Sequence, residues 1–434
     1  MRRNAGLRST VAPLLIILFL CTTMSCFSAV SGRSDINEIV PSSQRNIPPD
    51  YWPTEGWRNS TPQEHGMNNE TLYDMVRLID AQDYPVLSIV IVKDGYVVFE
   101  QYLSEYLTAQ YRHLLHSVTK SFTGALIGIA FQQGLLSGVN ETVLSFFPEY
   151  EIANPDPRKD RMTIEDLLTM TPGLDWDEWS TPYVDPDTNT LMGMMYSSDA
   201  VKFVLDRPMT SEPGTTWTYC GGASVLLGAI IQKVSNSSTL EFAHEYLFDP
   251  LGFDYGTWYL LPGGWYNTQG GLRLTTLDIA RLGFLYLNNG TWDGTQILPA
   301  DFIAQATSPI DIPNALGEPF GYGWHWWTRS DLGVYFAYGR YGQKIMVSPE
   351  HDLVVAFNAM VPDDGYDPEF DLFRDYILKS IEEGPDKSGT DSIPIQLYVA
   401  GLVLSVTMIP LIAAAVYVSV ARFQHRKPLS PETP

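Results

Sequence analysis

The sequence predicts an α+β fold, on two observations. Short runs rich in β-branched and aromatic residues occur early in the central part of the chain, at 87–101, and again late, at 345–357. The segments between these runs carry apolar residues at helical spacing. Strands at both ends of a domain with helices between them indicate a sheet that the C-terminal strands complete.

The elements are expected in a clear order along the chain. A first helix covers 69–81, where apolar residues recur every three or four positions. Strands over 87–92 and 96–101 follow, joined by the hairpin turn Lys93-Asp94-Gly95. A buried helix over 117–133 comes next and stops at a glycine. The remaining expected elements are helices over 163–170, 223–233, 275–287 and 370–381, and strands over 345–347 and 353–357.

Composition limits the classes of partner. The chain has 434 residues, 45% hydrophobic and 18% charged, as in a folded globular protein. Its 27 Lys and Arg residues against 50 Asp and Glu residues give a net charge of −23, which argues against nucleic acid as a partner. Three cysteines are too few for a disulfide scaffold, and the histidines form no H-E-x-x-H motif. We therefore expect no metal site.

An uncharged stretch near the N-terminus follows three arginines, Arg2, Arg3 and Arg8. This order is typical of a secretory signal, with a cleavage site after Ala29-Val30-Ser31. An uncleaved membrane anchor explains the same residues. Both interpretations predict that the chain that follows is exported from the cytoplasm.

A second uncharged stretch, 392–421, exceeds the roughly 20 residues needed to span a bilayer. It predicts a transmembrane helix; a buried core helix is the alternative, although the stretch has no polar face. Arg422, Arg426 and Lys427 follow at once, so the tail is expected in the cytoplasm and the main domain outside the cell membrane. The predicted parts are a signal peptide or anchor (1–31), a linker or strap (32–68), the main domain (69–383), a linker (384–395), a transmembrane helix (396–421) and a cytoplasmic tail (422–434).

One pair of residues suggests a catalytic function. Lys120 stands three positions after Ser117, and on the first turn of a helix this spacing places both side chains on one face. A lysine in a dry pocket can act as the base that activates a serine, if its pKa is lowered. The helix N-terminus also offers an N–H group to a developing oxyanion. Taken alone, the pair is better explained by a serine N-cap and an exposed helical lysine.

The surrounding residues decide between these interpretations. The segment 116–126, His-Ser-Val-Thr-Lys-Ser-Phe-Thr-Gly-Ala-Leu, resembles the nucleophile helix of the serine β-lactamase-related hydrolases, a family that includes class C β-lactamases, D-alanyl-D-alanine carboxypeptidases and esterases. Four more segments, 166–174, 213–219, 270–275 and 321–324, resemble the same family in the same order. The resemblance implies a β-lactamase/transpeptidase-like fold, with an antiparallel sheet flanked by helices and a helical subdomain.

The resemblance also assigns roles to residues beyond Ser117 and Lys120. The family's Tyr-x-Asn motif stands here as Tyr219-Cys220-Gly221. Tyr219 is thereby implied to share proton transfer with Lys120, and its pKa is expected to fall beside the lysine ammonium. Gly221 replaces the asparagine that would bind a substrate amide, which weakens the case for peptide or β-lactam turnover.

The family's third motif, which lies on a strand at the edge of the site, is matched best by Arg340-Tyr341-Gly342. In this register the backbone N–H of Gln343 is expected to form the oxyanion hole with that of Ser117. Arg340 could bind a substrate carboxylate or form a surface ion pair. Trp176 and Trp179, in the loop that borders the site in the family, are expected to wall an apolar pocket.

The function that follows is a membrane-anchored serine hydrolase, acting outside the cytoplasm on an ester or small amide through a covalent acyl-enzyme. No metal or organic cofactor is implied. A Ser-His-Asp triad of the α/β-hydrolase type is disfavoured, because no G-x-S-x-G motif occurs. The alternative is a binding or sensor protein that is acylated slowly or not at all on the same scaffold.

Overall fold

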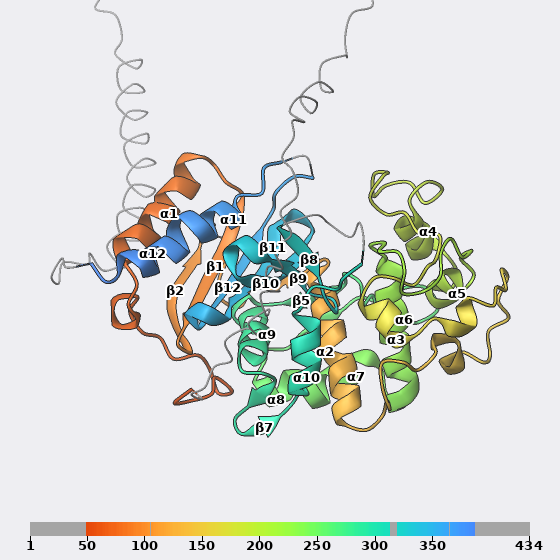
Figure 1. Cartoon of the computed structure of the whole chain (residues 1–434). Coiled ribbons are helices and arrows are strands. Elements are labelled where there is room, and N and C mark those ends of the chain that lie inside the picture. The colour runs from red at the N-terminus through yellow and green to blue at the C-terminus, as the bar shows by residue number, and fades with distance from the viewer. Residues whose placement is uncertain (1–48, 105, 313–318, 364, 387–434) are drawn as a thin grey trace, which may run out of the picture. The chain divides into compact units, whose positions relative to one another are not determined.

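The structure is a computed structural model that describes residues 49–104, 106–312, 319–363 and 365–386. Its centre is a seven-stranded antiparallel sheet with strand order β2-β1-β12-β11-β10-β9-β8 (Figure 1). The strands are β1 (Val86–Lys93), β2 (Tyr96–Tyr102), β8 (Phe320–Tyr322), β9 (Trp327–Arg329), β10 (Val334–Gly339), β11 (Gln343–Ser348) and β12 (Leu353–Ala359).

The sheet joins the two ends of the domain. β1 pairs with β12 in a register that places Ile89 opposite Phe357 and Ile91 opposite Val355. The predicted α+β fold is confirmed, including the hairpin of β1 and β2, whose turn residues Asp94 and Gly95 both have positive φ. The sequence did not predict β8 to β10, which are short and aromatic and lack a clean polar and apolar alternation.

Helices cover both faces of the sheet. The face packed against α1 (Asn69–Ala81) also receives the closing helical segment 369–383, and its core contains Met75, Phe357 and Phe373. The other face packs against α9 and, further along, α2. The remaining helices have these bounds: α2 Val118–Gln132, α3 Ile164–Leu168, α4 Thr190–Tyr196, α5 Ala200–Leu205, α6 Gly221–Ser235, α7 Thr239–Ala243, α8 Asp249–Leu251, α9 Thr276–Leu287, α10 Ala300–Ala306, α11 Glu369–Leu372 and α12 Lys379–Glu383.

The helices α3 to α7 form a separate helical region, grouped on one side of the sheet in Figure 1. α6 is its centre: it packs against α3, α5 and α7 and, toward the sheet, against α2. α2 is buried along nearly its whole length because it lies between this region and the sheet. A small sheet of β3 (His113–Leu114), β5 (Leu272–Leu274) and β4 (Thr257–Trp258) leads the chain into α2, and β6 (Thr291–Trp292) and β7 (Thr295–Gln296) form a hairpin.

The segment before the first helix was predicted to be a linker or strap. Its described part packs on the domain: Tyr51 is buried and donates a hydrogen bond to the Gly95 carbonyl, and Trp57 donates one to the Leu277 carbonyl. No helix among the described residues is long and apolar enough to cross a membrane. The predicted signal or anchor (1–31) and transmembrane helix (396–421) lie outside the described residues.

Candidate active site

Ser117 stands at the N-terminus of α2. It is the N-cap residue of this helix, but its side chain accepts no capping hydrogen bond. Its Oγ is instead 3.0 Å from Nζ of Lys120, one turn along the helix. The predicted pairing on one helix face is confirmed, and the interpretation of Ser117 and Lys120 as a cap and an exposed lysine is wrong.

Lys120 is held in a dry environment. Its side chain is 2% exposed, and Nζ also donates to the Gln269 carbonyl at 2.8 Å. Burial lowers the pKa of Lys120 to about 8, because it disfavours the ammonium form, while the carboxylate of Glu178 opposes this effect. An amine with this pKa is neutral in a useful fraction of molecules near neutral pH, as a general base requires.

Tyr219 lies beside this pair, just before α6. Nζ of Lys120 is 4.8 Å from the centre of the Tyr219 ring. The expectation that the pKa of Tyr219 falls is wrong: burial raises it well above 10, Tyr322 and Glu178 raise it further, and a hydrogen bond with Ser117 opposes them only in part. The phenol therefore stays protonated and can donate or relay a proton.

A buried carboxylate, Glu178, completes the group. It is 2% exposed, and its Oε2 accepts hydrogen bonds from Trp176 Nε1 and from the Gly221 backbone N–H, both at 2.7 Å. Sequence reasoning missed this residue. It stands in an acidic, aromatic loop, 174–179, where no spacing rule separates a buried acid from the exposed acids beside it.

Comparisons with known proteins agree with this geometry. The family model described as Beta-lactamase matches residues 74–373. The chain belongs to the beta-lactamase family. The matched residues fall within the predicted main domain, 69–383, and include Ser117, Lys120, Tyr219 and Glu178.

Relatives within the beta-lactamase family include hydrolases. The chain is 24% identical over 294 residues to 6-aminohexanoate-dimer hydrolase of Paenarthrobacter ureafaciens, covering 62% of this chain and 73% of that one. It is 24% identical over 220 residues to a putative D-alanyl-D-alanine carboxypeptidase of Escherichia coli K12, covering 45% and 49%. Among solved structures, a putative 6-aminohexanoate-dimer hydrolase from Bacillus anthracis has a TM-score of 0.61 at 19% identity, covering 75% of this chain and 87% of that one. This beta-lactamase family member is a serine hydrolase.

Gly221 replaces the asparagine of the family motif, and the structure gives a spatial reason. It is the first residue of α6, where a Cβ atom would lie 2.9 Å from Leu191 Cδ1 and 3.0 Å from Glu178 Oε2. Glu178, brought in by a distant loop, therefore occupies the space that a longer side chain at 221 would need.

Gly221→Asn should consequently destabilise the domain. We expect the free energy of unfolding to fall by about 1–3 kcal/mol, the usual cost of forcing extra atoms into a packed site. Denaturant unfolding measures this, with Gly138→Asn as the matched control because a Cβ at Gly138 meets nothing within 4 Å. Equal stability of the Gly221→Asn variant and the wild type would contradict the packing argument.

The residues matched to the third motif, Arg340–Gly342, do not lie on a strand. Arg340–Gly342 forms a tight turn between β10 and β11, because Tyr341 and Gly342 have φ of 67° and 91°, values that strands do not adopt. Gln343 is the first residue of β11 and is buried. The end of β10 approaches the start of α2 closely: a Cβ at Gly339 would lie 2.4 Å from the Leu115 carbonyl oxygen and 3.2 Å from the Val118 nitrogen. The pairing of the Ser117 and Gln343 N–H groups as an oxyanion hole stays a prediction.

Arg340 is paired within the chain. Its guanidinium forms a two-pronged ion pair with Asp363 and lies over the rings of Tyr183 and Tyr341. Tyr341 in turn packs edge-on against His116, the residue before the nucleophile. A substrate carboxylate would have to compete with Asp363 for Arg340, which favours an ion-pair role for this residue.

The two tryptophans predicted to wall a pocket, Trp176 and Trp179, differ in their exposure to solvent. Trp179 is 53% exposed and stacks on Tyr219, with ring centres 4.7 Å apart. Trp217 and Trp327 extend this aromatic surface around Tyr219. Trp176 is buried instead, packs against Gly222 and holds Glu178 through its indole N–H. Its contact with Glu178 indicates a supporting position, and its part in an apolar pocket stays a prediction.

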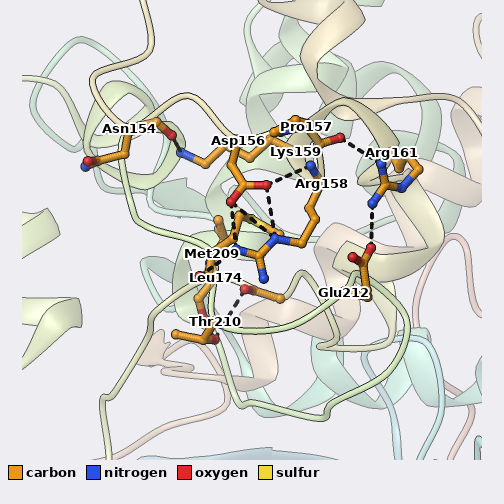
Figure 2. A network of polar contacts seen from close by, with 11 residues as sticks. Asn154, Asp156, Pro157, Arg158, Lys159, Arg161, Leu174, Met209, Thr210 and Glu212 are labelled. Carbon is orange, nitrogen blue, oxygen red and sulfur yellow. Dashed lines mark hydrogen bonds and ion pairs between the residues drawn. The ribbon is translucent and has the colours of Figure 1, made fainter.

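The loop that carries Glu178 is anchored at its start (Figure 2). Arg158 pairs with Asp156 and donates to the Met209 carbonyl at 3.1 Å, while Thr210 donates to the carbonyls of Gly173 and Leu174. Beyond the view, the backbone N–H of Asp175 donates to the Pro208 carbonyl at 2.7 Å. These bonds tie the segment before Trp176 to the chain at 208–210, which limits the positions that Glu178 can take.

Proposed function

We propose that this protein hydrolyses an ester or a small amide through a covalent acyl-enzyme on Ser117. The observation that carries the proposal is the 3.0 Å contact between Ser117 Oγ and a buried Lys120 whose pKa is about 8. A serine is a poor nucleophile until a base removes its proton, and a neutral lysine at hydrogen-bond distance is such a base.

In the proposed reaction, proton transfers connect Ser117, Lys120 and Tyr219. Neutral Lys120 takes the Ser117 proton while Oγ attacks the substrate carbonyl carbon, and the carbonyl oxygen becomes an oxyanion. The N–H groups of Ser117 and Gln343 are proposed to stabilise that charge. As the carbon–leaving group bond breaks, the proton passes from the Lys120 ammonium to the leaving group by way of the hydroxyl of Tyr219, whose ring lies beside Lys120. Water then attacks the acyl-enzyme by the same proton transfers in reverse and releases the acid.

The surroundings favour a substrate with an apolar or aromatic part. The exposed face of Trp179 and the rings of Trp217 and Trp327 surround Tyr219, and such rings gain free energy by covering an apolar group. An ester or small amide is proposed over a peptide because Glu178 and Gly221 stand where the family motif supplies a side-chain amide.

A fluorophosphonate probe tests the proposal, since it modifies serines that an adjacent base has activated. We expect one adduct on the peptide that contains Ser117, found by mass spectrometry, and hydrolysis of short-chain nitrophenyl esters. A folded protein that is neither labelled nor active would overturn the hydrolase proposal in favour of a binding or sensor protein.

We also propose that the domain works outside the cytoplasm, attached to the cell membrane by the segment 396–421, with a cytoplasmic tail. The support is the sequence: two long uncharged stretches and the basic residues that follow the second. The full chain should resist extraction from membranes by alkaline carbonate, whereas a chain ending at residue 391, after removal of the signal, should be released. Release of both would contradict the C-terminal anchor.

A further inference from the structure

We infer that Gln269 is a positioning residue for the catalytic lysine. Its side-chain amide, together with its own backbone carbonyl, accepts the two hydrogens of neutral Lys120 and so directs the lone pair of the amine at Ser117. This inference rests on the proposed acyl-enzyme chemistry and deepens it. It assigns a part in the reaction to a residue outside the segments that resemble the family motifs.

Three oxygen atoms surround Nζ of Lys120. Ser117 Oγ is 3.0 Å away, the backbone carbonyl oxygen of Gln269 is 2.8 Å away, and the side-chain oxygen of Gln269, Oε1, is 3.4 Å away. Among the described residues, these three atoms are the hydrogen-bond partners of the amine. Two of them belong to one residue, which is 7% exposed and therefore meets Lys120 away from water.

The number of hydrogens on the amine determines how these oxygens are used. A lysine ammonium ion carries three hydrogens, and the neutral amine carries two hydrogens and one lone pair. To take the proton of Ser117, Lys120 has to direct its lone pair at Oγ, so both of its hydrogens need acceptors elsewhere. The two oxygens of Gln269 are those acceptors. Without Oε1, one hydrogen would turn to Ser117 Oγ, and the lone pair would point away from the proton it has to remove.

The orientation of the Gln269 amide agrees with this part. If its NH2 group faced Lys120, the amide would bond to the lone pair itself and would repel the ammonium ion formed in acylation. With the oxygen facing Nζ, the lone pair stays available for Ser117 and the ammonium ion gains an acceptor. Hydrogen bonds from a charged donor are shorter than those from a neutral one, so the 3.4 Å contact is expected to shorten as Lys120 takes the proton.

The fold ties the segment that carries Gln269 to both helices of the site. Thr268, the residue before it, donates a side-chain hydrogen bond to the Ser224 carbonyl of α6 at 2.8 Å. The Thr123 hydroxyl of α2 donates to the Thr268 carbonyl, also at 2.8 Å. Because its backbone is held from two sides, Gln269 needs little rearrangement as charge develops on Lys120, which is the condition for effective electrostatic stabilisation.

Gly221 leaves room for the glutamine side chain. A Cβ atom at residue 221 would lie 3.5 Å from Gln269 Cγ, so the side chain of Gln269 passes the start of α6 at the position where the family motif has asparagine. The site therefore keeps a side-chain amide next to that position, although it comes from a distant segment of the chain.

Other titratable groups face Lys120, but among the described residues none of them forms a hydrogen bond with Nζ. Burial keeps the pKa of the tyrosine and of the thiol among them high, and it lowers the pKa of the two histidines to about 4 and about 3, so these four groups are neutral near pH 7. The groups are Tyr219, Cys220, His116, His325 and the carboxyl group of Glu178. All five remain in the variants used below, so a difference between those variants reports on Gln269.

Gln269→Met removes the acceptor and keeps the length of the side chain. Because one hydrogen of the neutral amine then turns to Ser117 Oγ, the plateau rate of fluorophosphonate labelling at high pH should fall roughly tenfold, about the effect of losing one hydrogen bond to a charged group. Thermal unfolding verifies that the variant is folded. A folded Gln269→Met protein that reaches the wild-type plateau overturns the inference.

Gln269→Glu keeps an oxygen at this position and adds a negative charge. The plateau should therefore approach the wild-type value, as a role in folding alone would not predict. The pH at which the labelling rate rises should increase by about one pH unit or more, because a carboxylate beside a lysine favours its ammonium form. The matched control is Gln133→Glu, which adds the same charge at an exposed residue at the other end of α2 and should give the wild-type profile. An unchanged profile in Gln269→Glu, or an equal shift in both variants, contradicts the inference.

A second readout does not depend on activity. Carbon-13 NMR titration of the lysine side chains reports the pKa of Lys120, whose signal is identified by its absence in Lys120→Met. A transition at higher pH in Gln269→Glu, and not in Gln133→Glu, supports the inference, and the same transition in wild type and Gln269→Glu overturns it. Absence of labelling in the wild type would contradict the proposed hydrolysis, while the titration would still decide whether the Gln269 side chain lies against Lys120.

Discussion

Replacing Ser117 with alanine should abolish both fluorophosphonate labelling and ester hydrolysis. Ser117 Oγ is the atom that we propose forms the acyl-enzyme, and removing the nucleophile of a serine hydrolase typically lowers kcat about a millionfold. The change removes one hydroxyl that makes no capping bond with α2, so the fold should be unaffected. Labelling detected by mass spectrometry and steady-state ester hydrolysis measure the loss.

Ser121→Ala is the matched control for this variant. Ser121 is buried on the same helix, one turn beyond Ser117, and donates a hydrogen bond to the His325 carbonyl. Its replacement should lower the free energy of unfolding by about 1–3 kcal/mol, the cost of a buried carbonyl without a donor, and leave labelling in place. Residual hydrolysis in Ser117→Ala near the wild-type rate would mean that another residue is the nucleophile.

Replacing Lys120 with methionine should lower the labelling rate about a hundred- to ten-thousandfold, the range that general-base catalysis contributes. The pH profile should change as well. In the wild type the rate should rise with pH up to about 8 and then level off, because the neutral amine is the active form and the pKa of Lys120 is about 8. In Lys120→Met this transition should be absent.

The loss of activity in Lys120→Met should not come from unfolding. Because the pKa of Lys120 is lowered in the folded state, the unfolded chain holds the proton more tightly between pH 8 and the ordinary lysine pKa. Burying Lys120 therefore lowers the free energy of unfolding. This loss is present in full below pH 8 and disappears as the pH rises through that window. A methionine avoids this cost but leaves the Gln269 carbonyl without its donor, so the two effects oppose each other and the temperature of thermal unfolding at neutral pH should change little.

Lys159→Met controls for the loss of a buried lysine. Lys159 is 1% exposed and donates to the carbonyls of Asn154 and Leu205, and it belongs to the polar network drawn in Figure 2. This variant should be less stable, since two carbonyls lose their donor, yet keep its labelling rate and its pH profile. If Lys120→Met were labelled as fast as Lys159→Met, another group would have to be the base.

Local patterns predicted the parts of the structure that depend on neighbours in the chain. The apolar spacing of the first helix gave bounds that match α1, and the turn at Lys93-Asp94-Gly95 placed the hairpin of β1 and β2. Ser117 and Lys120 are three positions apart, and helix geometry brings side chains at this spacing together wherever the helix lies in the fold. Such features follow from the periodicity of the backbone, which the sequence carries directly.

The third motif shows a conformation that local sequence patterns do not predict. Its place in the chain was predicted, but a strand was expected where Tyr341 and Gly342 form a turn with positive φ. The turn is set by close approaches that no local pattern contains: a Cβ at Gly342 would lie 2.3 Å from Glu369 Oε1, and one at Gly339 would meet the start of α2. The ion pair of Arg340 with Asp363 likewise joins residues 23 positions apart.

The sequence by itself determined the α+β class, the family and the pairing of Ser117 with Lys120, because these depend on short spacings and on ordered motifs. Only the tertiary structure decided the electrostatics of the site. It placed Glu178 against Gly221 across 43 positions of the chain, and it raised the pKa of Tyr219 where the motif suggested a fall. Burial and long-range charge pairing set these properties, and both exist only once distant segments have packed together.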